Sequence, residues 1–196
     1  MRKSINYILG NISGAVYVVL AVSIIFLPLR WVLAWLVATI FHEFCHYSAL
    51  SLLGYRISRL SFGIHGAIMH VEWMRWSHQL ICTLAGPIGS LVLLLFRKIF
   101  PEIALCAFIQ STYNMLPIMP MDGGRAISCL LTCWFTYERT LQILNVLKFG
   151  TLITIAIICV YAGICLHLGI LPVMVFVLLC LKNRKTPCKE VALRVQ

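Results

Sequence analysis

One short stretch of the chain, residues 41–47 (FHEFCHY), combines residue types and spacing that suit metal chemistry. His42 and His46 are four residues apart, so in a helix their side chains project about 40° apart on one face and can bind one metal ion. Glu43 lies beside them. In this H-E-x-x-H pattern the two imidazoles bind zinc and the carboxylate acts as a general base. The stretch therefore predicts a hydrolytic zinc site.

The sequence around this motif argues against a chance match. The motif lies within an apolar run, residues 31–53, that is long enough to cross a bilayer as a helix. Two histidines and a glutamate inside hydrocarbon are costly unless they are paired or bound to a metal, so such residues point to function. The alternative is a coincidental H-E-x-x-H, which this setting disfavours. We expect the zinc inside the membrane, below its mid-plane and toward the cytoplasm.

A second stretch, residues 114–125 (NMLPIMPMDGGR), offers a further ligand. Asp122 can be the third protein ligand, which leaves the fourth position of a tetrahedral zinc for water. Pro117 and Pro120 cannot continue a regular helix, and the two glycines after Asp122 free the backbone again. We expect this break to turn Asp122 back toward the zinc.

Asn114, at the start of the second stretch, is a candidate substrate-binding residue. Its amide could hydrogen-bond the substrate backbone or polarise the scissile carbonyl, and the alternative is a bond to a neighbouring helix. The six acidic residues of the chain are Glu43, Glu72, Glu102, Asp122, Glu138 and Glu190. Among these, Glu43 alone lies within an expected span and Asp122 alone at a broken span end, where the chemistry needs them.

Together, the two stretches resemble the motifs of the site-2 protease family of intramembrane zinc metalloproteases. The matching segments are H-E-x-x-H at 42–46, N-x-x-P-x-x-P-x-D-G-G at 114–124 and, as a small-residue and proline break, AGP at 85–87. The resemblance covers roughly residues 5 to 180. It implies an all-α integral membrane protein of about six transmembrane helices, with a small β-rich membrane-associated loop near the active site.

The resemblance also implies a reaction, the hydrolysis of a peptide bond in or near a transmembrane segment of a membrane protein. One zinc ion per chain, held by His42, His46 and Asp122, would lower the pKa of its bound water toward about 7 and polarise the carbonyl. Glu43 would take the water proton and pass it to the leaving amine. A helical substrate must first unwind, and the strand region could stabilise the unwound form through main-chain hydrogen bonds.

The compact chain is most similar to the bacterial branch of this family without a PDZ or CBS domain. That branch includes a protease that processes a sporulation sigma-factor precursor. The resemblance implies regulated intramembrane proteolysis, with a membrane-tethered transcription or sigma factor, or its inhibitor, as a candidate substrate. The expected partners are this substrate and the lipid bilayer; a regulatory membrane protein is an open option, and nucleic acid is not expected.

Two other classes of protein compete with this interpretation. A zinc transporter would need a second set of ligands along a path, whereas this sequence has one cluster and no histidine-rich loop. A non-catalytic zinc-binding membrane protein of the same fold could dispense with Glu43, which is present. The full set of expected catalytic residues favours the protease.

Composition places these motifs in a polytopic membrane protein. Apolar residues make up 61% of the 196 positions, more than in a soluble globular protein. The expected spans are about 12–29, 31–53, 79–96, 103–119, 143–162 and 165–181. We expect one membrane metalloprotease domain, residues 1–182, followed by a short basic cytoplasmic tail, residues 183–196.

The charge distribution orients the expected spans. The net charge of +10 could suggest nucleic-acid binding, but cytoplasmic loops of membrane proteins carry an excess of lysine and arginine. Most basic residues fall in the segments that six spans place on the side of the N-terminus, and Arg30, Arg97 and Lys98 fall on the other side. We therefore expect a multi-pass protein of the cell membrane with both termini in the cytoplasm.

The remaining histidines and the nine cysteines are expected to be structural. Between the second and third spans, residues 60–64 alternate at period two and residues 67–73 could return as a second strand. His65, His70 and His78 show no pairing that suggests a ligand set. Scattered cysteines without paired C-x-x-C spacing argue against a disulfide framework or a thiolate zinc site, so we interpret them as packing residues.

Overall fold

The computed structural model describes residues 28–55, 59–63, 66–71 and 74–165. The chain divides into two compact units, Met1–Asn114 and Met115–Gln196. The described elements of the first unit are α3 (Leu29–Leu52), β1 (Arg59–Gly63), β2 (Gly66–His70), α4 (Trp76–Leu91), the 3-10 helix η1 (Val92–Phe96) and α5 (Pro101–Asn114). Those of the second unit are α6 (Asp122–Leu131) and α7 (Tyr137–Cys165). The described part of the chain is therefore mostly helical, as expected.

A glycine cap ends α3, the helix that carries the first motif. Gly54 has a φ of 79°, in the left-handed region that glycine adopts without strain. The Tyr55 amide then donates to the Leu50 carbonyl at 3.0 Å, and the Gly54 amide donates to the Ser51 carbonyl at 3.0 Å. These bonds satisfy carbonyls that the helix end would otherwise leave unpaired. The helix therefore ends at Leu52, less than two turns after His46.

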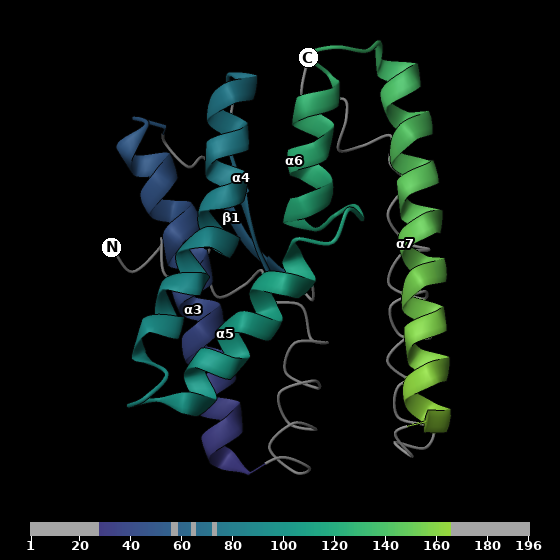
Figure 1. The fold of residues 1–196 in the computed structure, drawn as a ribbon. Helices are drawn as coiled ribbons and strands as arrows, with labels where there is room; N and C mark the ends of the chain where they lie inside the picture. The colour runs from purple at the N-terminus through teal and green to yellow at the C-terminus, as the bar shows by residue number, and fades with distance from the viewer. Residues whose placement is uncertain (1–27, 56–58, 64–65, 72–73, 166–196) are drawn as a thin grey trace. The chain divides into compact units, whose positions relative to one another are not determined.

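Small side chains let α3, α4 and α5 pack against one another (Figure 1). The contact between α3 and α5 is centred on a buried cluster of Ala34, Ala38, Cys106 and Ala107. Trp31, Leu93 and Ile103 pack around this cluster. Small residues at a helix interface allow the backbones to approach closely, as is common between membrane helices. This packing fixes α3 against the helices that surround its histidines.

A two-stranded antiparallel hairpin connects α3 to α4. Its register runs from the pair Arg59–His70 to the pair Gly63–Gly66. The hairpin lies where the alternating sequence predicts strands. Its association with a membrane and its place beside the active site stay predictions.

The helix α4 continues through its internal proline. Pro87 lacks an amide hydrogen and would be expected to kink or break a helix, yet α4 runs on to Leu91 before it tightens into η1. The Ser111 hydroxyl of α5 donates a hydrogen bond to the Pro87 carbonyl at 2.8 Å. This bond joins α4 to α5 at the point where the proline interrupts the helical hydrogen-bond pattern.

The predicted break of the fourth span is present. α5 ends at Asn114 instead of continuing to residue 119, and residues 115–121 form a turn closed by main-chain hydrogen bonds. The turn contains a cis peptide bond before Pro120. α6 then begins at Asp122.

From the sequence, residues 126–140 are predicted to form one interfacial helix that ends near Glu138 and Arg139. The structure shows that the bounds of this prediction are wrong. α6 ends at Leu131 and α7 begins at Tyr137. The amides of Cys133 and Trp134 bond carbonyls three residues earlier, so the end of α6 tightens and the chain leaves the α-helical path. α7 continues to Cys165, the last described residue of the chain.

Two of the described helical segments, Trp76–Phe96 and Tyr137–Tyr161, are long and apolar enough to cross a membrane. They correspond to the third and fifth expected spans. α3 matches the second expected span in its bounds, but His42, Glu43 and His46 lower its hydropathy. The first expected span, 12–29, lies almost entirely outside the described residues. Of the sixth, 165–181, only the first residue is described. The full count of six spans stays a prediction.

Candidate metal centre

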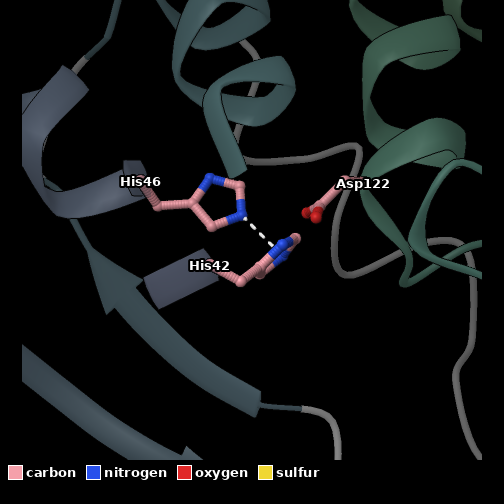
Figure 2. A group of neighbouring side chains, drawn as sticks. All are labelled: His42, His46 and Asp122. Atoms are coloured by element: carbon pink, nitrogen blue, oxygen red, sulfur yellow. Dashed lines mark hydrogen bonds between the residues drawn. The ribbon is translucent and has the colours of Figure 1, made fainter. Parts of the chain in front are cut away.

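One face of α3 brings the first motif's imidazoles together. The Nε2 atoms of His42 and His46 lie 3.2 Å apart, and the rings meet edge to face at an interplanar angle of 84° (Figure 2). His42 is 2% exposed and His46 is half-buried. The spacing of four residues therefore places both rings on one face of the helix, as the sequence predicts.

The partner of His46 on its other ring nitrogen fixes its tautomer. Nδ1 of His46 lies 2.7 Å from the main-chain carbonyl of Cys82 on α4. A carbonyl oxygen only accepts hydrogen bonds, so Nδ1 carries the hydrogen and donates it. The Nε2 atom of neutral His46 then has a lone pair directed toward His42. This is the arrangement of a metal-binding histidine, whose second nitrogen donates to a carbonyl or carboxylate.

His42 has the same tautomer for a different reason. The side-chain nitrogen of Asn114 lies 3.1 Å from Nε2 of His42, and an amide NH₂ group only donates. Nε2 of His42 therefore accepts, and the ring hydrogen is on Nδ1. Nδ1 lies 3.0 Å from the hydroxyl oxygen of Ser90 on α4.

The two facing nitrogens fit a tetrahedral zinc ion. Nitrogens that each bind one zinc at about 2.0–2.1 Å with tetrahedral angles lie about 3.3–3.4 Å apart. The Nε2 atoms of His42 and His46 are 3.2 Å apart. Two lone pairs at this distance repel each other unless a proton or a metal ion lies between them. The donor set and its geometry therefore suit a metal ion.

A glycine on α4 makes room for the His46 ring. A Cβ atom built on Gly86 would overlap three ring atoms of His46. One turn further on, a Cβ on Gly89 would overlap the Cys45 side chain. The glycines on either side of Pro87 predict, from the sequence, that this segment packs closely against the first motif's helix. The structure confirms this contact, and Cys45 is a packing residue there.

Asp122 is the first residue of α6 in the second unit. Its side chain is 9% exposed, and its carboxylate is at a helix N-terminus, where negative charge is stabilised. A Cβ on Gly123 would overlap the Met115 carbonyl, and one on Gly124 would lie 2.6 Å from the Ile118 carbonyl carbon. The two glycines therefore allow α6 to start directly against the preceding turn, which buries Asp122.

The structure brings together three of the predicted site residues, His42, His46 and Asn114. Glu43 is half-buried on α3, next to His42. Nδ1 of His78 lies 2.9 Å from the Tyr55 hydroxyl, a contact between the end of α3 and the start of α4. His70 is the last residue of β2; its side chain and the whole of His65 lie outside the described part of the chain.

The sequence interpretation missed Ser90 and the Cys82 carbonyl. Both contact the motif's histidines from α4. Their spacing contains a signal, because residues 82, 86 and 90 recur every four positions and lie on one helix face. Gly86 was already recognisable as a site of close packing, so the polar neighbours one turn away on the same face were the residues to consider.

Comparisons with known proteins support the fold. No protein-family model matches the chain, and no curated protein matches it. Among solved structures, the chain is similar to the site-2 protease from Methanocaldococcus jannaschii, with a TM-score of 0.58 and 18% sequence identity. The similarity covers 83% of this chain and 81% of that chain. At this identity it shows that the two proteins share a fold.

Proposed function

We propose that this protein is an intramembrane zinc metalloprotease of the site-2 protease family. One observation carries the proposal: the Nε2 atoms of His42 and His46 face each other at 3.2 Å on α3, in a chain with the fold of a site-2 protease. In this pair each ring donates through Nδ1 and keeps Nε2 for a metal ion. The resemblance of the H-E-x-x-H and N-x-x-P-x-x-P-x-D-G-G motifs supports the same conclusion.

The proposed ligands of one zinc ion per chain are His42, His46 and Asp122, the two histidines of the first motif and the aspartate of the second. Two imidazoles and one carboxylate are a ligand set of catalytic zinc sites, which keep a fourth position open. A bound zinc supplies Lewis acidity and lowers the pKa of water. The burial of His42 and Asp122 supports this role, because their polar atoms are removed from solvent.

Two further residues have proposed roles in the reaction. Glu43 takes a proton from the attacking water and delivers it to the leaving amine, the role of the glutamate in H-E-x-x-H. Asn114 orients or polarises the scissile carbonyl. Its amide nitrogen is 3.1 Å from a proposed ligand atom, Nε2 of His42, so an amide donor is present beside the reacting centre.

The proposed substrate is a transmembrane or membrane-associated protein, cut in or near an apolar segment. A membrane-tethered transcription or sigma factor, or its inhibitor, belongs to this class. The protease domain, residues 1–182, would cross the cell membrane about six times with both termini cytoplasmic. The β1–β2 hairpin offers main-chain groups that could hold an unwound substrate segment.

Replacement of the proposed base tests the function directly. We expect Glu43→Gln to lower peptide-bond cleavage by at least about 100-fold, while the purified protein keeps one zinc ion. The measurement compares the protein N-termini in membranes of host cells that carry wild-type or Glu43→Gln protein. A precursor should accumulate only with the variant, and the wild-type cut should map to an apolar segment. Metal analysis of Asp122→Ala, expected to lose zinc, serves as the control for the ligand set.

Other results would contradict the proposal in different ways. Cleavage by Glu43→Gln at the wild-type rate would remove Glu43 as the base. Wild-type protein without zinc after purification in zinc-containing buffer would exclude the metal site. Identical membrane-protein termini with one bound zinc would favour the alternative of a non-catalytic zinc-binding protein.

A further inference from the structure

We propose that Ser90 is a positioning residue of the metal centre, because it holds His42 in the tautomer and orientation that present Nε2 to a metal ion. The inference rests on the proposed function, since it assumes that His42 is a ligand. It adds a residue on another helix, α4, outside both sequence motifs. It also distinguishes the two histidines, because the ring of His46 is held by a backbone carbonyl and the ring of His42 by a side chain.

The hydrogen-bond directions around Ser90 assign its role. The Ser90 hydroxyl donates its one hydrogen to the Gly86 carbonyl at 2.9 Å. Toward His42 Nδ1, at 3.0 Å, Ser90 can then only accept. His42 must therefore present Nδ1–H to Ser90, and its lone pair must be on Nε2.

The opposite tautomer of His42 is disfavoured at both ring nitrogens. A hydrogen on Nε2 of His42 would point toward the Asn114 amide nitrogen, which lies 3.1 Å away and already donates a hydrogen bond to this atom. A lone pair on Nδ1 would face the oxygen lone pairs of Ser90. Both neighbours therefore select the tautomer that leaves Nε2 for a metal ion, and Ser90 selects it without occupying Nε2.

Burial makes this hydrogen bond hard to replace. Ser90 is fully buried, at 0% exposure, and His42 is 2% exposed, so water has little access to Nδ1. Without the hydroxyl, the Nδ1–H group is a buried donor without its acceptor. His46 differs, because its Nδ1 donates to the backbone carbonyl of Cys82, which no side-chain substitution removes.

The test compares Ser90→Ala with a matched control, Ser111→Ala. Ser111 is also buried, at 2% exposure, and its hydroxyl also donates to a carbonyl of α4, that of Pro87. It has no hydrogen bond to His42 or His46 in the described structure. Zinc affinity is measured by competition with a chelator of known affinity, on the full chain in detergent. We expect Ser90→Ala to bind zinc about 10–100-fold more weakly than wild type and Ser111→Ala to bind it like wild type.

A second readout needs no metal. In metal-free protein labelled with ¹⁵N-histidine, at a pH where the imidazoles are neutral, the nitrogen chemical shifts report which ring nitrogen carries hydrogen. We expect His42 to be the Nδ1–H tautomer in wild type and Ser111→Ala, and to shift toward a mixture in Ser90→Ala. A purely structural role for Ser90 would leave this tautomer ratio unchanged. The nitrogen signals that disappear in the His42→Gln variant are assigned to His42.

The outcomes separate the inference from the proposed function. If wild type binds no zinc, both are overturned. If wild type and Ser90→Ala bind zinc equally and show the same His42 tautomer, only the inference is overturned. If Ser90→Ala does not fold, Ser90→Cys replaces it, because sulfur is a weak acceptor of similar size. A folded Ser90→Cys protein with wild-type zinc affinity would then overturn the inference.

Discussion

At the scale of single residues, the absence of one side chain is as important to the candidate site as the ligands themselves. Gly86 lies under the ring of His46, in space that a Cβ atom would share with the ring. The same glycine provides the carbonyl that accepts the Ser90 hydroxyl hydrogen. One position on α4 therefore affects His46 by contact and His42 through Ser90. Substitution of Gly86 should disturb both histidines.

We predict that Gly86→Ala destabilises the protein by about 1–3 kcal/mol, the usual cost of overpacking, and abolishes stoichiometric zinc binding. Displacement of the His46 ring is the physical reason. The matched control is Gly150→Ala in the middle of α7, where a Cβ would meet nothing within 4 Å. Alanine should stabilise that helix by up to about 1 kcal/mol. Thermal unfolding and metal analysis of both variants provide the measurement. Full zinc occupancy in Gly86→Ala would show that the ring has room to move.

The residue scale also shows what a sequence can and cannot reveal about a site. The four-residue spacing of His42 and His46 determines their shared helix face, and the structure has both rings there. The sequence also predicts that Gly86 packs closely on the motif's helix. The sequence does not reveal that the neighbour of Gly86 is the ring of His46, because this contact depends on how α3 and α4 are shifted along each other. Ser90 was missed for the same reason.

At the scale of secondary structure, α6 (Asp122–Leu131) is largely buried, and the chain becomes exposed past its end. Cys129 is fully buried, at 0% exposure, whereas Cys133, one turn later, is exposed. Burial raises the pKa of the Cys129 thiol to about 11. A thiol with this pKa is almost entirely protonated at neutral pH, so Cys129 is a poor thiolate ligand and a poor nucleophile. The interpretation as a packing residue is consistent with this geometry for Cys129, whereas the exposure of Cys133 does not fit it.

We predict that a thiol-alkylating reagent at pH 8 modifies Cys133 and leaves Cys129 unmodified in the folded protein. The raised pKa leaves about one thiolate in a thousand at Cys129 at this pH, and labelling should increase only as the pH approaches 11. Trypsin releases both cysteines in one peptide, residues 126–139, and fragment-ion masses locate the label. The denatured protein, labelled at both positions, is the control. Rapid labelling of Cys129 in folded protein would contradict the burial of this residue.

The helix bounds follow the sequence where strong local signals exist. Pro117 and Pro120 predict the break before α6, and α5 ends at Asn114. The alternating residues predict the hairpin. Between α6 and α7 no proline or glycine marks the turn, so one helix over 126–140 was expected and two were found. Here the chain turns through 3-10 hydrogen bonds that residues of ordinary helix propensity can adopt.

At the scale of the whole molecule, length and apolar composition predict spans, and charge predicts their direction. The third and fifth expected spans correspond to helices long and apolar enough to cross a membrane. α3 shows where hydropathy alone is insufficient: it has 24 residues, but its three ionisable motif residues lower its apolar character. A functional site inside a span therefore weakens the signal by which the span is recognised. Orientation rests on the basic residues and is open to a direct test.

We predict that the helical segment Trp76–Phe96 crosses the membrane with its first residue on the cytoplasmic side. Reporters fused after Arg75 and after Lys98, at its two ends, should give opposite results. Alkaline phosphatase, active only outside the cytoplasm, should be active after Lys98 and inactive after Arg75, and a fluorescent protein that matures in the cytoplasm should show the reverse. The physical reason is that short loops rich in lysine and arginine are retained in the cytoplasm.

A third fusion, after Thr136, extends this prediction to the fourth and fifth spans. Because residues 103–119 should return the chain to the cytoplasm, phosphatase at Thr136 should be inactive, as it is after Arg75. Activity after both Lys98 and Thr136 would show that α5, with 14 residues, does not cross. Activity after Arg75 with none after Lys98 would invert the whole topology, and the proposed zinc site would then open toward the opposite side of the membrane.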